Sequence, residues 1–481
     1  MEPAVPVHYS RLMTAPDPGF RAALQMALEK ALLYLETLDQ APVSALVDPA
    51  TLRRRLAKPL PEDGIAPEEV IAGLVRDAAG GHIGSAGGRF FAWVIGGSLP
   101  AAMAADWLTS AWDENATLFA SAPAAAIVEE TAGQWLKEIL CLPASAAFAF
   151  VTGCQMAHTT CLAAARHALL ASRNWDVEER GLCGAPAIRV LANDQRHGTI
   201  ERSLRLLGMG RDSLINLPCD EQGRVVPDVL RQALEAGPDA PTIVLMQAGD
   251  LNIGAYDPFD ALIPLAHHHN AWVHVDGAFG LWAAASPRYR YLLRGVEQAD
   301  SWATDGHKWL NVPYDCGYAF VAKPEALRSA MSHRESYLIH ATAERDAIDW
   351  TPEWSRRARG YPTYAALRQL GRRGVADLVE RCCLHAQSLV TRMAALPGVE
   401  VLWQPVINQG LVRFLDPHGS GHDAWTDHVI AEIVRTGEAF FGGAAWRGRR
   451  AMRVSVCNWR TTDADIDRTV RAVSRVLGAR E

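Results

Sequence analysis

The chain has 481 residues, which is enough to bury a large core in two or three domains. Its net charge of -7, from 47 Lys and Arg against 54 Asp and Glu, leaves no basic face and argues against a nucleic-acid partner. Nine cysteines, an odd number without a C-x-x-C pair, argue against a disulfide framework or a structural zinc site and predict a reducing, cytoplasmic location. We expect no signal peptide and no membrane span, because the sequence lacks a charged leader and any run of about 18 apolar residues.

The N-terminal part has apolar residues at helical spacing. Five of them predict an amphipathic helix over residues 20–40: Leu24, Leu28, Ala31, Leu32 and Leu35. Pro67 opens a second short helix, in the first-turn position that proline prefers. A stretch rich in glycine and aromatic residues then precedes a helix over 101–108.

From residue 124 onward, predicted helices alternate with short apolar strands. The strands are predicted at 148–151, 186–192, 243–247, 272–275, 300–304 and 316–321. This alternation, with glycine at the turns, predicts a doubly wound α/β domain. A long helix from about Tyr364, three further apolar runs and a final helix predict a small α+β domain. We therefore divide the chain into an arm with a pocket segment (1–100), a large domain (101–360) and a small C-terminal domain (361–481).

The stretch 271–310 contains a carboxylate followed by a lysine, an order that indicates a cofactor site. Asp276 follows the apolar run 272–275, where the ligand crevice of an open α/β sheet lies, and Lys308 follows thirty-two residues later. A lysine in apolar surroundings can act as an amine nucleophile, and pyridoxal phosphate (PLP) is the main cofactor that uses one. PLP also needs an anion beside its ring nitrogen, so that the ring acts as an electron sink. Each residue alone is more often a turn cap or a solvated side chain.

The segments HVDGAFG and DGHKW resemble those of the group II PLP-dependent decarboxylases, which include aromatic-amino-acid, glutamate and histidine decarboxylases. The resemblance runs from about residue 20 to the end and implies fold type I: a mixed, mostly parallel sheet, a small α+β domain, and a helical arm that embraces the partner subunit of a homodimer. It implies that Lys308 forms a Schiff base with PLP and that Asp276 pairs with the pyridinium nitrogen. Ala278 is implied to pack on one face of the ring. His197 is implied to stack on the other face, where an imidazole can also move protons.

The turn after the run 148–151 predicts a phosphate site, because N–H groups at a helix start favour an anion. We expect Cys154 and Gln155 to donate these N–H groups; the alternative is an ordinary strand-to-helix turn. The family has small residues at these positions and commonly Asn at the position of His158, so the share of the side chains in phosphate binding stays open. Asp305 and His307, beside Lys308, complete the predicted cofactor-binding residues together with Asp250.

Asp250 stands where the family has a threonine or a polar amide, near the 3'-oxygen of the cofactor and the substrate carboxylate. An acid there would repel a second anion. Three alternatives follow: Asp250 turns away, is protonated, or meets a substrate with a cationic group.

The glycine- and aromatic-rich stretch matches the substrate-pocket segment of the family, although Gly87–Arg89 replaces the usual His-Pro. The match nominates Phe91, Trp93, Val94, Gly96 and Gly97; the alternative is a packed loop. No metal site is predicted, because the neighbouring side chains of His267, His268 and His269 point in different directions on a helix.

The resemblance implies decarboxylation of an L-amino acid, with Phe91 and Trp93 hinting at an aromatic side chain. The loop 332–354 matches the mobile loop of the family, but Ala347 stands where many relatives have the tyrosine that donates a proton after carbon dioxide leaves. In relatives, loss of this tyrosine diverts the reaction to oxidative deamination and an aldehyde. Oxidative deamination, aminotransfer and carbon–carbon lysis on PLP therefore remain alternatives. A non-catalytic PLP-binding regulator is less favoured, because the N-terminus carries no basic DNA-binding domain.

Overall fold

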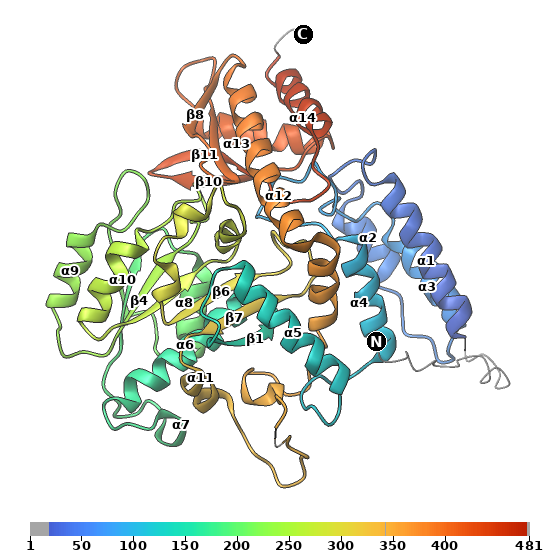
Figure 1. Ribbon diagram of the computed structural model, residues 1–481. Helices are drawn as coiled ribbons and strands as arrows, with labels where there is room; N and C mark the ends of the chain where they lie inside the picture. The colour runs from blue at the N-terminus through green and yellow to red at the C-terminus, as the bar shows by residue number, and fades with distance from the viewer. Residues whose placement is uncertain (1–18, 342, 479–481) are drawn as a thin grey trace. The chain divides into compact units, whose positions relative to one another are not determined.

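The computed structural model describes residues 19–341 and 343–478. Its contacts divide the chain into two compact units, with the boundary in the sequence between Gly84 and Ser85. The first unit contains the helices α1 (Phe20–Thr37), α2 (Pro49–Leu56) and α3 (Pro67–Ala78) (Figure 1). The predicted amphipathic helix is α1, and none of its side chains is buried. The N-terminal residues that bear on a signal peptide lie outside the described residues.

The second unit is built on a seven-stranded sheet in the order β1-β7-β6-β5-β4-β2-β3. The strands are β1 (Ala147–Val151), β2 (Arg189–Asn193), β3 (Leu214–Leu217), β4 (Thr242–Gln247), β5 (Trp272–Asp276), β6 (Ser301–Asp305) and β7 (Gly317–Val321). Every pair is parallel except the two that involve β7, so the predicted mixed, mostly parallel sheet is confirmed. Parallel strands place their carboxyl ends at one edge, where a ligand crevice forms.

Alternate residues of the buried strands pack into two separate cores. On β1, Phe148 and Phe150 join one core, whereas Ala147, Ala149 and Val151 join the other. The small residues of the second face accept the alanine-rich helix α6 (Cys154–Ala171), which contacts β6 and β7. A strand that is apolar on both faces needs such a cover on both sides, and this explains its unbroken apolar sequence.

The remaining elements of the large sheet's domain precede, connect or follow its strands. The helices are α4 (Pro100–Trp112), α5 (Pro123–Ile139), α7 (Val177–Arg180), α8 (Gly198–Leu206), α9 (Pro227–Glu235), α10 (Phe259–His268) and α11 (Pro324–Met331). Short 3₁₀ helices occur at Gly280–Ala285, Arg290–Leu293, Val296–Gln298 and Ala347–Asp349. No helix among the described residues is long and apolar enough to cross a membrane.

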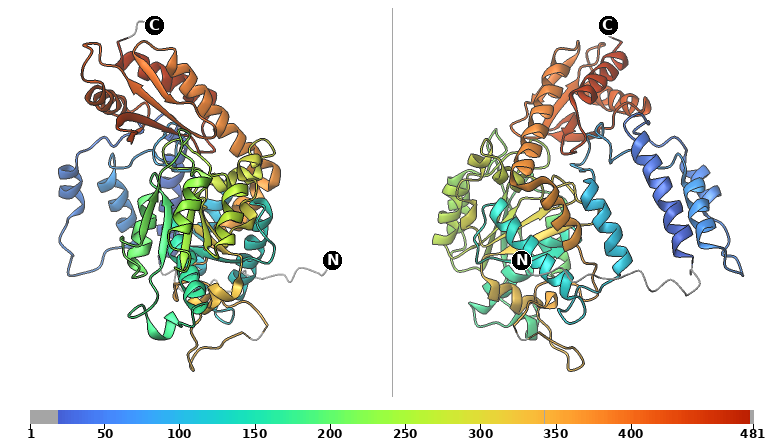
Figure 2. Two further views of the ribbon diagram at one scale, coloured as in Figure 1. Left: turned by 90° about the vertical axis from the view of Figure 1, so that its left-hand side faces the viewer. Right: turned by 45° about the vertical axis from the view of Figure 1, so that its right-hand side comes forward.

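A long helix, α12 (Gly360–Ala394), leads from the large sheet to a second sheet of four antiparallel strands (Figure 2). It breaks at Gly371, whose φ of 62° lies in the left-handed region that glycine adopts at little cost. The second sheet has the order β10-β11-β9-β8, from β8 (Val399–Trp403), β9 (Gln409–Phe414), β10 (Gly442–Trp446) and β11 (Arg449–Ser455). Helix α13 (His422–Arg435) packs on this sheet, and α14 (Asp463–Val476) packs on α12 and α13, which gives the α+β architecture expected of this part.

Candidate active site

A cavity of about 440 Å³ lies at the carboxyl ends of the parallel strands. All predicted cofactor-binding residues except Asp250 line it: Cys154, Gln155, His197, Asp276, Ala278, Asp305, His307 and Lys308. They come from the ends of β1, β2, β5 and β6 or from the turns that follow. Chain segments more than 150 residues apart in sequence thus meet at the edge that the strand order predicts.

Asp276 is the last residue of β5, and its carboxylate is held from two sides. Oδ1 accepts the N–H of Ala278 at 3.1 Å, and Oδ2 lies 3.5 Å from Nε2 of His158 on α6. Burial alone would raise the pKa of this carboxyl, but the nearby His158, His197 and Lys308 outweigh burial and bring the pKa below its ordinary value. Asp276 is therefore an anion at neutral pH.

Lys308 lies in the turn after β6 and forms an ion pair with Asp305, whose Oδ2 is 3.0 Å from Nζ. Burial would lower the pKa of the amine, but the carboxylates of Asp305 and Asp276 outweigh burial and raise the pKa above its ordinary value. Apolar surroundings alone would favour a neutral, nucleophilic amine, but here the neighbouring acid keeps the free amine protonated.

One of the two predicted phosphate donors has a partner within the chain. The N–H of Cys154 donates to Oδ1 of Asp305 at 2.5 Å, so the first turn of α6 already binds a carboxylate of its own chain. Gln155 still lines the cavity beside it. The helix start attracts an anion, as predicted, but an internal acid shares that place.

His197 caps the start of α8. Its Nδ1 lies 2.8 Å from Oγ1 of Thr199 and accepts the N–H of Thr199 at 3.3 Å. With Nδ1 used as an acceptor, the proton of the neutral ring is on Nε2. Burial lowers the pKa of His197, so the ring is neutral at pH 7. A neutral imidazole can stack on a cofactor ring and still donate a proton from Nε2.

Asp250 does not line the cavity. Its carboxylate is buried in its own turn, where it accepts the N–H groups of Asn252 at 2.8 Å, Ile253 at 3.3 Å and Ala255 at 2.7 Å. The assignment of Asp250 to the cofactor is therefore corrected. Of the three alternatives, the side chain turns away and holds the loop after β4.

The predicted substrate segment is only partly exposed to the cavity. Trp93 and Val94 line it, and both have the positive φ angles, 56° and 58°, that side-chain-bearing residues seldom adopt. Phe91 is fully buried and stacks on Phe441, with ring centroids 5.3 Å apart, so it supports the wall from behind. Gly97 also lies outside the lining and donates its N–H to the side chain of Asn311.

Gly96 is the place where this segment approaches the lysine turn. A Cβ at Gly96 would lie 1.9 Å from the carbonyl oxygen of Lys308. We expect Gly96→Ala to lower the free energy of unfolding by about 1–3 kcal/mol and to weaken PLP binding, because backbone must move on one side or the other. Thermal unfolding and the absorbance of bound cofactor measure both effects. Gly64→Ala, at a glycine with no atom within 4 Å of the added carbon, is the control. Unchanged stability and cofactor content in Gly96→Ala would contradict the expectation.

Several other side chains line the cavity that were not predicted from the sequence: Thr199, Gln247, Leu251, Phe279 and Arg453. Arg453 is on β11 of the small sheet, and its Nη1 donates to the carbonyl of Leu251 at 2.8 Å. Only the folding of the small domain onto the cavity brings this guanidinium to the site.

The loop 332–354, in which Ala347 stands at the position of the expected tyrosine, contributes none of its described residues to the cavity lining. Ala347 is buried in a 3₁₀ helix, and Tyr337 is 72% exposed. Neither a tyrosine nor any other residue of this loop lines the cavity within the described part of the chain.

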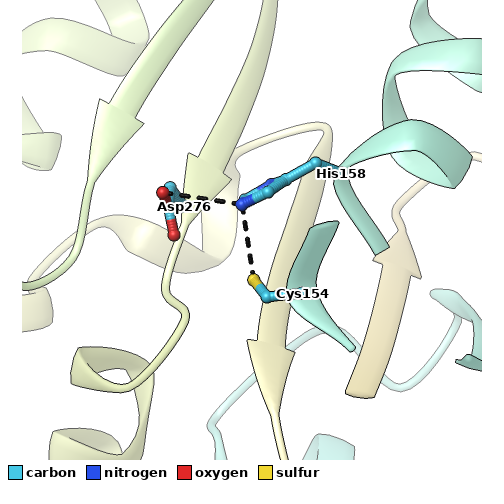
Figure 3. Close-up of side chains that lie close together, drawn as sticks. All are labelled: Cys154, His158 and Asp276. Atoms are coloured by element: carbon cyan, nitrogen blue, oxygen red, sulfur yellow. Dashed lines mark hydrogen bonds and ion pairs between the residues drawn. The ribbon is translucent and has the colours of Figure 1, made fainter. Parts of the chain in front are cut away.

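Three buried side chains close to the cavity have the residue types of a metal site. One ligand atom each from Cys154, His158 and Asp276 lies within 4.8 Å of the others (Figure 3). Burial, together with the carboxylates of Asp305 and Asp276, raises the pKa of the Cys154 thiol well above its ordinary value. A thiol that keeps its proton is a poor metal ligand.

The residues present fit PLP. Lys308 offers the amine, Asp276 an anion for the ring nitrogen, and His197 an imidazole for one face of the ring. On the other face, Ala278 contributes only a methyl group, which leaves room for a flat ring. The start of α6 and Gln155 lie where an anionic phosphate is favoured.

Comparison with known proteins agrees with this donor set. A family model for the pyridoxal-dependent decarboxylase conserved domain matches residues 52–415. An aromatic-L-amino-acid decarboxylase of Bacillus atrophaeus is 26% identical over 450 residues, 92% of each chain. A 4-hydroxyphenylacetaldehyde synthase of Rhodiola rosea is 27% identical over 352 residues, 72% of this chain and 71% of that protein.

The fold is shared with solved structures as well. Oryza sativa TDC with PLP and tryptamine matches with a TM-score of 0.89 at 24% identity, over 95% of this chain and 97% of that chain. Since the family model spans well over half of the 481 residues, the chain belongs to the pyridoxal-dependent decarboxylase family, and PLP is its cofactor.

Proposed function

We infer that the chain removes the carboxylate of an L-amino acid as carbon dioxide, with PLP as cofactor. One observation carries this inference: the amine of Lys308, the ionised carboxylate of Asp276 and the imidazole of His197 line the same cavity. Bound PLP supplies an electron sink for the pair of electrons left on the α-carbon when its bond to the carboxylate breaks.

The side chains of the cavity divide the remaining tasks. Lys308 would hold the cofactor through Nζ, and the same amine, once released, can carry a proton within the cavity. Asp276 would keep the ring nitrogen cationic, because its own carboxylate stays ionised. His197 lines the same cavity and could pass a proton to the α-carbon after carbon dioxide leaves only once it has gained a second proton, because a neutral ring that gave up its one N–H proton would become an imidazolate.

The substrate is an amino acid with an apolar or aromatic side chain. Trp93, Val94, Leu251 and Phe279 give the cavity apolar walls, and Arg453 adds a fixed positive charge that attracts a carboxylate. With the carboxylate of Asp250 held in its own turn, the cavity does not require a cationic substrate group. The Bacillus atrophaeus relative is named as an aromatic-L-amino-acid decarboxylase, which supports this choice.

A second outcome, oxidative deamination to an aldehyde, is favoured by the loop. Within the described residues, no tyrosine lines the cavity to protonate the α-carbon. The balanced reaction would convert an amino acid, dioxygen and water into an aldehyde, carbon dioxide, ammonia and hydrogen peroxide. The relative from Rhodiola rosea is named for an aldehyde product. We rank this outcome second, because the amine of Lys308 can supply the missing proton.

Product analysis separates the two outcomes. Purified, PLP-loaded chain is incubated with each L-amino acid in D₂O, and amine, aldehyde, carbon dioxide, ammonia and peroxide are measured. We expect amine and carbon dioxide in a ratio of one, with one deuterium on the α-carbon of the amine. Aldehyde, ammonia and peroxide in equal amounts would establish the second outcome, and no carbon dioxide from any amino acid would overturn both.

We also propose a homodimer and a cytoplasmic location. The dimer is supported by α1, where Leu24, Leu28 and Leu32 remain exposed along one helix. Contiguous apolar surface of this kind is typical of a protein interface. The location is supported by the nine cysteines, all of which are free.

A further inference from the structure

A buried line of hydrogen-bonding groups runs from the core of the sheet to Asp276. Nε1 of Trp272 donates to Oγ of Ser301 at 2.9 Å, and Oγ lies 2.9 Å from Nδ1 of His274. Nε2 of His274 is 2.9 Å from Nδ1 of His158, whose Nε2 is 3.5 Å from Oδ2 of Asp276. His158, His274 and Ser301 are completely buried, and Figure 3 shows the His158 ring pointing from α6 toward Asp276.

The donors along this line can be ordered from its fixed end. An indole N–H only donates, so Ser301 accepts from Trp272 and passes its own proton to Nδ1 of His274. His274 then donates from Nε2 to Nδ1 of His158, and His158 donates from Nε2 toward Asp276. In this order each ring carries one proton, on its Nε2.

The reverse order is less favourable. In it, Nδ1 of His158 donates to Nε2 of His274, and Nδ1 of His274 donates to Oγ of Ser301. To donate toward Asp276 as well, His158 would have to carry a second proton, and hence a charge, at a completely buried position. We therefore assign the order that runs toward Asp276, in which one proton on each ring is enough.

We propose that His158, oriented by His274 and Ser301, is a positioning residue that keeps the carboxylate of Asp276 ionised and aimed at the ring nitrogen of the cofactor. This inference rests on the proposed function and adds residues to it. The chain thus uses an imidazole pair behind the acid.

The contacts of Cys154, His158 and Asp276 are less consistent with a metal site than with this positioning role. Nδ1 of His158 is engaged by His274, and in the assigned order Nε2 carries a proton and has no lone pair for an ion. The Cys154 sulfur, 3.4 Å from Nε2, belongs to a thiol that remains protonated. A tightly bound metal needs deprotonated ligands.

Several other titratable groups face this line and would contribute to any pH dependence. Lys308 and His197 lie toward Asp276 from the cavity, and Asp305 faces Cys154 and Lys308. The test therefore compares cofactors that differ at one atom and does not depend on a pH profile.

The probes are PLP and its 1-deaza analogue, in which a carbon replaces the ring nitrogen. Their dissociation constants are measured for cofactor-free wild type, His158→Leu, His158→Gln and the control His385→Gln, which changes a buried histidine of the small domain. Circular dichroism and thermal unfolding verify that each chain is folded.

We expect wild type and His385→Gln to prefer PLP over the analogue by about tenfold or more, because a carbon in place of the ring nitrogen cannot donate to the carboxylate of Asp276. His158→Leu should lose most of this preference. His158→Gln should recover part of it, because the glutamine amide can donate toward Asp276. A role confined to packing would weaken both cofactors equally.

An unchanged preference in folded His158→Leu, or equal loss for both cofactors, overturns the inference and leaves the proposed function intact. Failure of wild type to bind PLP at all overturns the proposed function and the inference with it. Elemental analysis after incubation with Zn²⁺ is expected to show no stoichiometric ion, and one bound ion per chain that requires His158 would also overturn the inference.

Discussion

Replacement of Lys308 by alanine is expected to reduce decarboxylation by roughly 10⁴-fold or more, because one side chain both holds the cofactor and carries a proton. Lys308 is the lysine that lines the cavity, and its amine is kept in place by Asp305. The covalent link to PLP should disappear together with turnover.

Two measurements check this result. The rate of amine formation gives the loss of activity, and mass spectrometry after borohydride reduction shows whether PLP is attached to the chain. Lys323→Ala, which changes a lysine with a 67% exposed side chain, is the control and should retain both. A reducible adduct in Lys308→Ala would show that another amine holds the cofactor.

Asp276→Asn is expected to have the second largest effect, a loss of about 10²–10⁴-fold in kcat. The amide keeps the size of the side chain and removes its charge, so the ring nitrogen is no longer held cationic. The pKa of Asp276 lies below its ordinary value, and the wild-type carboxylate is therefore an anion throughout about pH 5 to 9. Protonation of Asp276 should not limit the rate anywhere in that range.

The matched comparison for this prediction is Asp276→Glu, which keeps the charge and moves it by one methylene. We expect Asp276→Glu to retain considerably more activity than Asp276→Asn, as measured by kcat and by the dissociation constant of PLP. Equal kcat values for wild type and Asp276→Asn would mean that the ring works without a cationic nitrogen, and the assignment of Asp276 would be wrong.

The strands that bear the site could be predicted because they are buried on both faces. Runs such as β4, which is apolar from 243 to 246, and β5, which is apolar except for His274 before its final Asp276, have boundaries that differ from the predicted ones by a residue at most. The missed strands are β3, two of whose four residues are exposed, and β10, which begins with two glycines. Neither has the apolar or β-branched run by which strands are recognised.

Site residues that depend on tertiary pairing could not be predicted. The contact between His274 and Ser301 follows from the parallel register of β5 and β6, which places these two residues opposite each other. Arg453 reaches the cavity from another domain. Similarly, no sequence pattern distinguishes a carboxylate that faces a cavity from one that binds its own loop, as Asp250 does.

The ion pair of Lys308 with Asp305 also affects the newly made chain. An ammonium does not attack carbonyl compounds, so the resting lysine is protected from stray metabolic aldehydes and sugars. Only an aldehyde that stays bound until the ammonium loses its proton can form a Schiff base with Lys308. The long residence time comes from the groups that bind a ring and a phosphate. Retention in the cavity, more than intrinsic reactivity of the amine, thus determines which aldehyde the folded apoprotein takes up.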